Sequence, residues 1–140
     1  MAELSTYMED RIVNFMRNVA ITGQAAVYVG LFCAASTGEE DLATLDAELE
    51  AGTITSEVSG GGYARELAGL SASSNGVSAN AGDITFDTAT GAWGTITHCA
   101  LIDAITAGNV VMWSRFDAFK AVASGDTYKI NTGDLDVVII

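Results

Sequence analysis

Apolar side chains recur at helical spacing near the start of the chain. They fall three or four residues apart on one face, and they are Met8, Ile12, Phe15, Met16 and Val19. Thr6 and Glu9 have the spacing of a capping box, in which each side chain satisfies a free backbone donor, and Gly23 is a residue type that ends helices. The pattern predicts a helix over residues 5–22. We favour a helix that covers one end of a sheet; the alternative is an arm that docks on a partner.

Two contrasting segments follow this helix. Val27–Cys33 is rich in β-branched and aromatic residues with almost no polar side chain, which predicts a buried strand. Residues 36–57 then form a strongly acidic insertion without a basic residue. In it, Leu42, Leu45 and Leu49 recur at helical spacing, a Thr37–Glu40 capping box can start a helix, and Gly52 can end it. A short acidic helix within a surface excursion is the economical interpretation.

From Val58 onward, short apolar runs alternate with clusters of Gly, Ser, Thr, Asn and Asp. This pattern, with no further helical periodicity, is typical of mainly β proteins with many short strands. We therefore predict a single mainly β domain over residues 1–140, a β-sandwich or jelly-roll-like barrel with an N-terminal α-helix and the acidic helical insertion. The helix should lie against a two-layer core that contains Leu31, Phe32, Trp93, Ile96, Leu101, Val111 and Trp113.

Composition narrows the classes of partner. Hydrophobic residues make up 49% of the chain and charged residues 17%, with a mean hydropathy of +0.32, so the chain can fold around a core. The longest apolar run, residues 25–35, is shorter than the roughly 20 residues that a spanning helix needs. We see no signal peptide and expect synthesis in the host cytoplasm. Six basic residues against 18 acidic ones give a net charge of −12, which disfavours nucleic acid and anionic membranes as partners.

Enzymatic motifs do not stand out. His98 and Cys99 are adjacent on a predicted strand, so their side chains point to opposite faces and cannot form a dyad; we expect His98 at the sheet surface or an interface. Cys33 lies in an apolar run like Cys99, and both are expected to be buried thiols. Zinc-protease, phosphate-loop and nucleophile-elbow motifs are missing, and no cofactor is predicted. Paired aspartates, at Asp83–Asp87 and Asp134–Asp136, make a weak calcium site the lesser alternative.

Two classes therefore stay open from the residues alone: a structural assembly protein and a glycan-binding module. The second would need aromatic sugar platforms, and the candidates are Tyr28, Tyr63, Trp93 and Trp113.

Three stretches together resemble a family of small phage virion proteins. They are Tyr7–Asp10 with Asn14 leading into Val27–Phe32, then Thr55–Arg65 with its EVSGGGYAR sequence, and then Ala81–Phe86 running on to Ala92–His98. The most specific of them is EVSGGGYAR, and the loop after Cys33 is longer than the family pattern. Members of the family are tail fibre proteins or capsid decoration (cement) proteins, and the resemblance implies a non-enzymatic virion component.

On this basis the sequence predicts a decoration protein at the capsid surface of the virion. Its partner would be the major capsid protein, and it would form a homo-oligomer there; a tail or tail-fibre component is the alternative. The predicted contact residues are Met8, Ile12, Phe15, Tyr63 and Arg65. Arg65 should also pair with a carboxylate, and Gly60–Gly62 should adopt positive φ in a turn or bulge.

Overall fold

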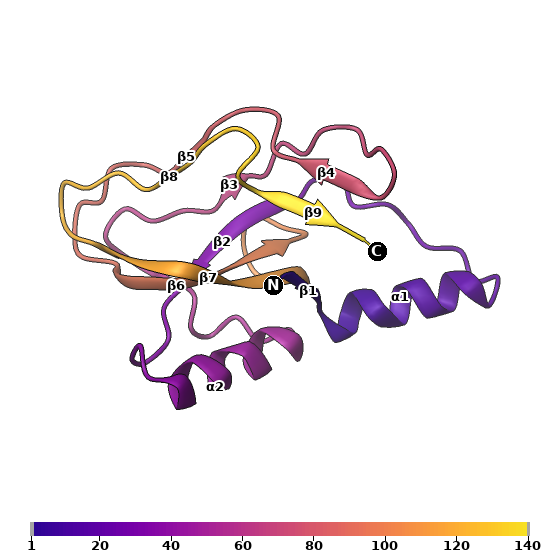
Figure 1. The fold of residues 1–140 in the computed structure, drawn as a ribbon, viewed down its shortest axis with the longest axis horizontal. Helices are drawn as coiled ribbons and strands as arrows, with labels where there is room; N and C mark the ends of the chain where they lie inside the picture. The colour runs from indigo at the N-terminus through magenta and orange to yellow at the C-terminus, as the bar shows by residue number, and fades with distance from the viewer. Residues whose placement is uncertain (1, 140) are drawn as a thin grey trace.

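The computed structural model describes residues 2–139 and is organised by a five-stranded antiparallel sheet with the order β1-β7-β6-β2-β3 (Figure 1). Along the chain the elements are β1 (Ala2–Leu4), α1 (Thr6–Met16), β2 (Tyr28–Phe32), α2 (Glu39–Glu50), β3 (Glu66–Leu67), β4 (Val77–Ala79), β5 (Ile84–Thr85), β6 (Gly94–Ile102), β7 (Val110–Val122), β8 (Lys129–Ile130) and β9 (Asp136–Val138). The predicted class is confirmed: the protein is mainly β, with an N-terminal helix and an acidic helix.

One face of the sheet is covered by two short two-stranded sheets, β5 with β8 and β4 with β9, and by the loops around them. The larger core lies between these layers and includes Leu31, Ile96, Leu101 and Val111. An aromatic cluster extends it, with Tyr63 stacked on Phe86 and the rings of Trp93 and Tyr128 set edge-on to that of Phe86. All seven predicted core residues are buried.

The other face of the sheet is covered by α2. Its buried residues are Leu42, Leu45 and Leu49, as the spacing predicted, and the last two pack with Phe32 and Trp113 in a second core. The acidic insertion is therefore part of the packing rather than a surface excursion. Gly52 lies just beyond the helix with a φ of 81°, and its N–H donates to the Leu49 carbonyl. The predicted Thr37 capping box is wrong, because Gly38 is the N-cap and makes no side-chain cap bond.

Strands β6 and β7 are irregular where they pair. The register shifts between Ile96 and His98, where residues 116–119 of β7 lie opposite Thr97. A bulge changes which face the following side chains occupy, so Ile96 shares the larger core with Cys99 although the two positions differ in parity. Because both faces of β6 are covered, its residues from Ile96 to Ile102 are all buried.

The N-terminal helix differs from the prediction. Ser5, not Thr6, is the N-cap, and its hydroxyl accepts from the Met8 N–H. The helix ends at Met16 rather than residue 22, because Asn18 adopts the left-handed conformation (φ 63°) that typically terminates helices. None of its residues is fully buried, and it touches the larger core through Met8 in its first turn rather than lying along the core as expected; it leaves the sheet at β1 and projects from one side (Figure 1).

Candidate interaction surface

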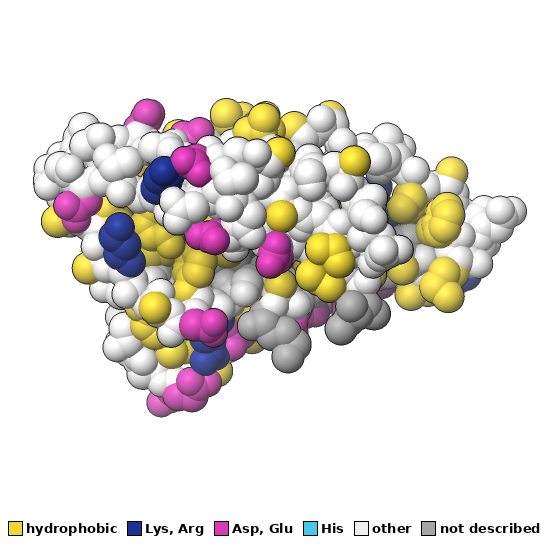
Figure 2. All heavy atoms as spheres, turned by 45° about the horizontal axis from the view of Figure 1, so that its top comes forward, with side chains coloured by type: hydrophobic (Ala, Val, Ile, Leu, Met, Phe, Trp, Pro, Cys, Tyr) yellow, Lys and Arg dark blue, Asp and Glu magenta, His cyan; other side chains and the backbone are white. Residues whose placement is uncertain are grey.

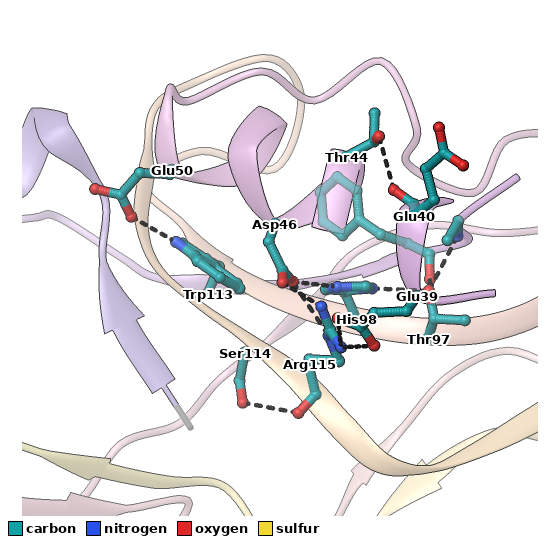
Figure 3. A network of polar contacts seen from close by, with 12 residues as sticks. Glu39, Glu40, Thr44, Asp46, Glu50, Thr97, His98, Trp113, Ser114 and Arg115 are labelled. Carbon is teal, nitrogen blue, oxygen red and sulfur yellow. Dashed lines mark hydrogen bonds and ion pairs between the residues drawn. The ribbon is translucent and has the colours of Figure 1, made fainter. Parts of the chain in front are cut away.

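A polar network fastens α2 to the sheet and contains the single histidine (Figure 3). His98 on β6 is fully buried; its Nε2 lies 2.7 Å from Asp46 Oδ1 on α2, and its Nδ1 lies 2.8 Å from Thr97 Oγ1. Arg115 on β7 donates to both Asp46 and Glu39. The prediction that His98 lies at the sheet surface or an interface is therefore wrong, because α2 of the same chain covers it.

The Thr97–His98–Asp46 chain has the composition of a hydroxyl–imidazole–carboxylate relay, but its surroundings exclude that role. Thr97 is 1% exposed, and its Oγ1 already accepts the Ala34 N–H at 3.0 Å. Burial lowers the pKa of His98 and outweighs the opposing effect of Asp46, so the neutral ring donates from Nε2 to Asp46 and accepts at Nδ1 from Thr97. A substrate cannot reach the hydroxyl, and the network is a structural clamp.

The two thiols are not built for nucleophilic chemistry either. Cys99 lies in the larger core, on the face opposite His98, as predicted. Burial raises the pKa of Cys99 to about 12 and also raises that of Cys33. Because the thiolate is the reactive form, the raised pKa values disfavour nucleophilic chemistry at both cysteines at neutral pH. Both are free, and Cys33 is only partly buried, contrary to the prediction.

The EVSGGGYAR stretch forms a second interior network. Arg65 is 6% exposed and binds both carboxylate oxygens of Glu57, Nε at 2.7 Å and Nη2 at 2.6 Å. Its Nη1 donates to the carbonyls of Ala104 and Ala107, both at 2.7 Å. The Tyr63 hydroxyl donates to Glu57 at 2.8 Å and accepts the Leu31 N–H at 2.9 Å. This network ties three distant segments together, and the prediction that Arg65 pairs with a carboxylate is confirmed.

The three glycines of this stretch have a steric role. All adopt positive φ, as predicted, at 74°, 56° and 78° for Gly60, Gly61 and Gly62. A Cβ on Gly61 would lie 2.8 Å from the Gly91 carbonyl oxygen, and the Gly61 carbonyl accepts the Trp93 indole N–H at 2.8 Å. The close approach of these two turns therefore requires glycine.

The structure separates the five predicted contact residues. Arg65 lies in the interior and Tyr63 is partly buried beside it, so neither presents its polar group to a partner. Met8 packs against the larger core and Ile12 is half-buried, whereas the Phe15 side chain is 63% exposed. That these residues make contacts in an assembly stays a prediction. Phe15 is the strongest candidate of the five, because its side chain is the most exposed.

An exposed apolar surface surrounds Phe15. We call α1 together with the segment up to Gly23 the α1 arm. Its large exposed apolar side chains lie near its far end and are Val13, Phe15, Met16, Val19 and Ile21. Figure 2 shows hydrophobic side chains gathered at that end of the molecule, on the right. From Ile12 to Gly23 the sole charged residue is Arg17.

The arm is held to its own body only at its base. Ser5 is fully buried and hydrogen-bonds β7, with its N–H donating to the Val111 carbonyl at 3.1 Å. Arg11 donates to the Tyr7 hydroxyl and to the Thr22 carbonyl, which holds the returning segment along the helix. The run Val19-Ala20-Ile21, which continues the apolar pattern beyond the helix, was the sequence signal for this surface. Periodicity alone did not show that these apolar side chains stay uncovered in the folded chain.

The described residues form neither a metal site nor a membrane-spanning helix. Between Ala2 and Ile139, no three His, Cys, Asp or Glu side chains come close enough together to hold a metal ion. The helices described in that range are too short or too polar to cross a bilayer.

The polar side chains of the two interior networks are engaged within the chain, whereas the α1 arm leaves apolar side chains exposed. This arrangement is typical of a class of protein that works through contacts with other proteins. The comparisons with known proteins agree with this class. The family model for podophage GP4 fiber I protein gp80 matches residues 3–138, almost the whole chain. The chain belongs to this family and is thus a phage virion structural protein. A search of curated proteins gives no match.

Proposed function

We propose that the protein is a non-enzymatic structural subunit of a podophage fibre, held among its neighbours by the α1 arm. The exposed apolar surface around Phe15 is the observation that carries this role. Contiguous apolar surface on a soluble protein commonly marks a contact site for another protein. The fibre assignment rests on the description of the matching family. It favours the tail-fibre alternative over the decoration protein that the sequence analysis placed first.

Decoration of the capsid, with the major capsid protein as partner, is the second candidate. The acidic net charge of −12 supports it, because an acidic protein is not drawn to the packaged genome. The glycan-binding alternative loses the two tryptophans among its four candidate sugar platforms. Trp93 and Trp113 are 6% and 7% exposed, and their indole N–H groups are engaged by Gly61 and Glu50, so neither offers a face to a sugar.

The test is the place of the protein in the virion. We expect cryo-electron microscopy of purified particles to show its density in fibres that leave the tail or the portal vertex. Density repeated over the icosahedral lattice would instead support decoration, and a mature particle without the protein would reject both candidates.

The role of the arm has its own test. Particles made with the Phe15→Ser/Met16→Ser subunit should lose the protein, whereas particles made with Ile105→Ser should keep it. Ile105 is a matched control because it is an apolar side chain, 56% exposed, in the loop before β7. Equal incorporation of the two variants would contradict attachment through the arm.

A further inference from the structure

A second apolar feature lies on the body of the protein, beside Ala2 of β1. It is a partly open groove of about 490 Å³ between the β6–β7 face of the sheet and the segment that leads into β9. Its apolar lining comes from both layers and includes Cys99, Leu101, Met112, Phe116, Leu135 and Val137. Pockets that bury ligands measure about 300–1,000 Å³, so the groove can take more than one large side chain.

The groove has an acidic rim. Asp117, Asp134 and Asp136 line it, and all three are exposed. Arg115 also lines the groove, but its guanidinium is bound to Asp46 and Glu39 at the other face of the sheet. The local charge that a ligand would meet is therefore negative.

The end of the α1 arm has the complementary properties. Phe15 and Met16 are 63% and 78% exposed, and Arg17 follows them directly. Arg17 is itself exposed and makes one hydrogen bond, to Asn14 of its own helix at 3.3 Å. Two large apolar side chains beside one exposed cation match an apolar groove with a carboxylate rim in both polarity and charge.

The far end of the α1 arm points away from the groove of its own molecule (Figure 1). The chain passes from Ala2, which touches the groove, through β1 into α1, and α1 then leads away from the sheet (Figure 1). We infer that the α1 arm of one subunit docks in this groove of a second copy, with Phe15 and Met16 in the groove and Arg17 against the acidic rim. The inference rests on the proposed role of the arm and names its partner.

Docking of this kind is head-to-tail, because the two surfaces are different. Such contacts close into rings or continue as a filament, and either arrangement suits repeated subunits in a fibre. Each subunit then uses its arm once and its groove once. A pair of subunits would leave one arm and one groove free.

The test uses purified protein in sedimentation velocity at high micromolar concentration. The wild-type chain should sediment as dimers and larger species. Phe15→Ser/Met16→Ser, with a defective arm, and Asp117→Arg/Asp136→Arg, with a repulsive rim, should each sediment as monomers. Mixed in equal amounts, these two variants should form dimers and nothing larger, because only one intact arm and one intact groove remain per pair.

A charge exchange and a control sharpen this result. Arg17→Glu should be monomeric, because it brings a carboxylate against the acidic rim and like charges repel, and combining it with Asp117→Arg/Asp136→Arg in one chain should restore association, since opposite charges then face each other again. The control, Glu40→Arg/Asp87→Arg, changes two exposed acids that do not line the groove and should associate as the wild type does.

Each remaining outcome overturns the inference. A wild-type chain that stays monomeric, a defective-arm variant that still associates, or a defective-rim variant that still associates would each do so. Loss of the protein from Phe15→Ser/Met16→Ser particles combined with a monomeric wild type would leave the proposed function standing and place the partner of the arm in another virion protein.

Discussion

The Glu57–Arg65 pair shows what a single interaction contributes inside this protein. Both side chains are largely buried, at 13% and 4% exposure, and the Tyr63 hydroxyl and two carbonyls complete their hydrogen bonding. Hydrogen bonding to Glu57 raises the pKa of Arg65, so its guanidinium stays charged inside the protein. Removing one partner leaves the other charge buried without compensation.

We expect Glu57→Gln to lower the free energy of unfolding by about 3–5 kcal/mol, the usual cost of breaking a buried pair. Urea denaturation of the purified protein measures this. The matched control is Lys129→Gln, because Lys129 pairs with Asp83 where both side chains are 45% exposed. An exposed pair contributes under about 1 kcal/mol, so similar losses in the two variants would contradict the role of Glu57 as a buried lock.

The clamp around His98 predicts how stability depends on pH. Burial lowers the pKa of His98 from its ordinary value of 6.5, so on acidification the unfolded chain takes up a proton before the folded one does. The stability is therefore present above about pH 6.5 and declines as the pH falls from there towards the folded pKa.

Asp46 also makes the free energy of unfolding decrease as the pH falls, but at a lower pH than His98 does. Desolvation of Asp46 would raise its pKa, but the hydrogen bonds from Arg115 and His98 outweigh this effect and lower it from 3.8.

For His98, we expect the free energy of unfolding, measured with urea, to fall between about pH 7.5 and about pH 5.5, on either side of the ordinary histidine pKa. His98 is the single histidine, so a constant value over that range would contradict its burial in the neutral form.

At the scale of elements, the two helices have opposite roles. In α2 the side chains of Leu42, Leu45 and Leu49 are buried, and polar contacts from His98 and Arg115 hold it on the sheet. In α1 no side chain is buried, and most of the helix is free for a partner. The acidic helix is thus the structural one and the N-terminal helix the functional candidate.

Trp113 tests the packing of α2. Its ring is 7% exposed between the sheet and α2, and its Nε1 donates to Glu50 Oε2 at 3.0 Å. Trp113→Ala should lower the free energy of unfolding by about 3–5 kcal/mol, because a large cavity opens beneath the helix. Glu50→Gln keeps an acceptor at the indole and should cost far less. Equal stability of the wild type and Trp113→Ala in urea denaturation would show that α2 is not anchored there.

The sequence allowed α2 and the strands to be predicted because their signals are local. Leucine spacing placed α2, and apolar runs between turn clusters placed β2, β6 and most of β7. The ends of α1 were misplaced because Thr6 and Gly23 are acceptable caps in isolation, whereas buried Ser5 and left-handed Asn18 act in their place. His98 was misplaced for a related reason: its partner Asp46 is distant in the chain, and no local pattern links them.

The candidate site was only partly predictable. Phe15 was selected from the amphipathic pattern, and the structure leaves it exposed. Arg65 was selected from a specific motif, but that specificity reflects a buried lock, since a motif that must satisfy several hydrogen bonds is as constrained as a binding site. The groove combines residues from β6, β7 and the segment before β9, and only the folded chain brings these together.

At the scale of the whole molecule, acidic charge is unevenly distributed over the surface. Most of the acidic residues lie on the body, while the far end of the α1 arm carries Arg17 among apolar side chains. A fibre subunit with this distribution can repel its neighbours in solution over most of its surface and still attach through one defined contact. Assembly would then depend chiefly on apolar burial at the arm, with charge adding orientation.

This division predicts how the protein responds to salt in the virion. Burial of apolar surface contributes roughly 25 cal/mol per Å², whereas an exposed ion pair such as Arg17 with the groove rim contributes under about 1 kcal/mol. At 1 M salt the Debye length is about 3 Å, so exposed pairs are screened while apolar contacts persist. Particles incubated in molar salt and pelleted should therefore retain the protein, as judged by immunoblot of the pellet. Quantitative release would show that charge holds the subunit, and would direct attention to the acidic helix Glu39–Glu50 instead of the arm.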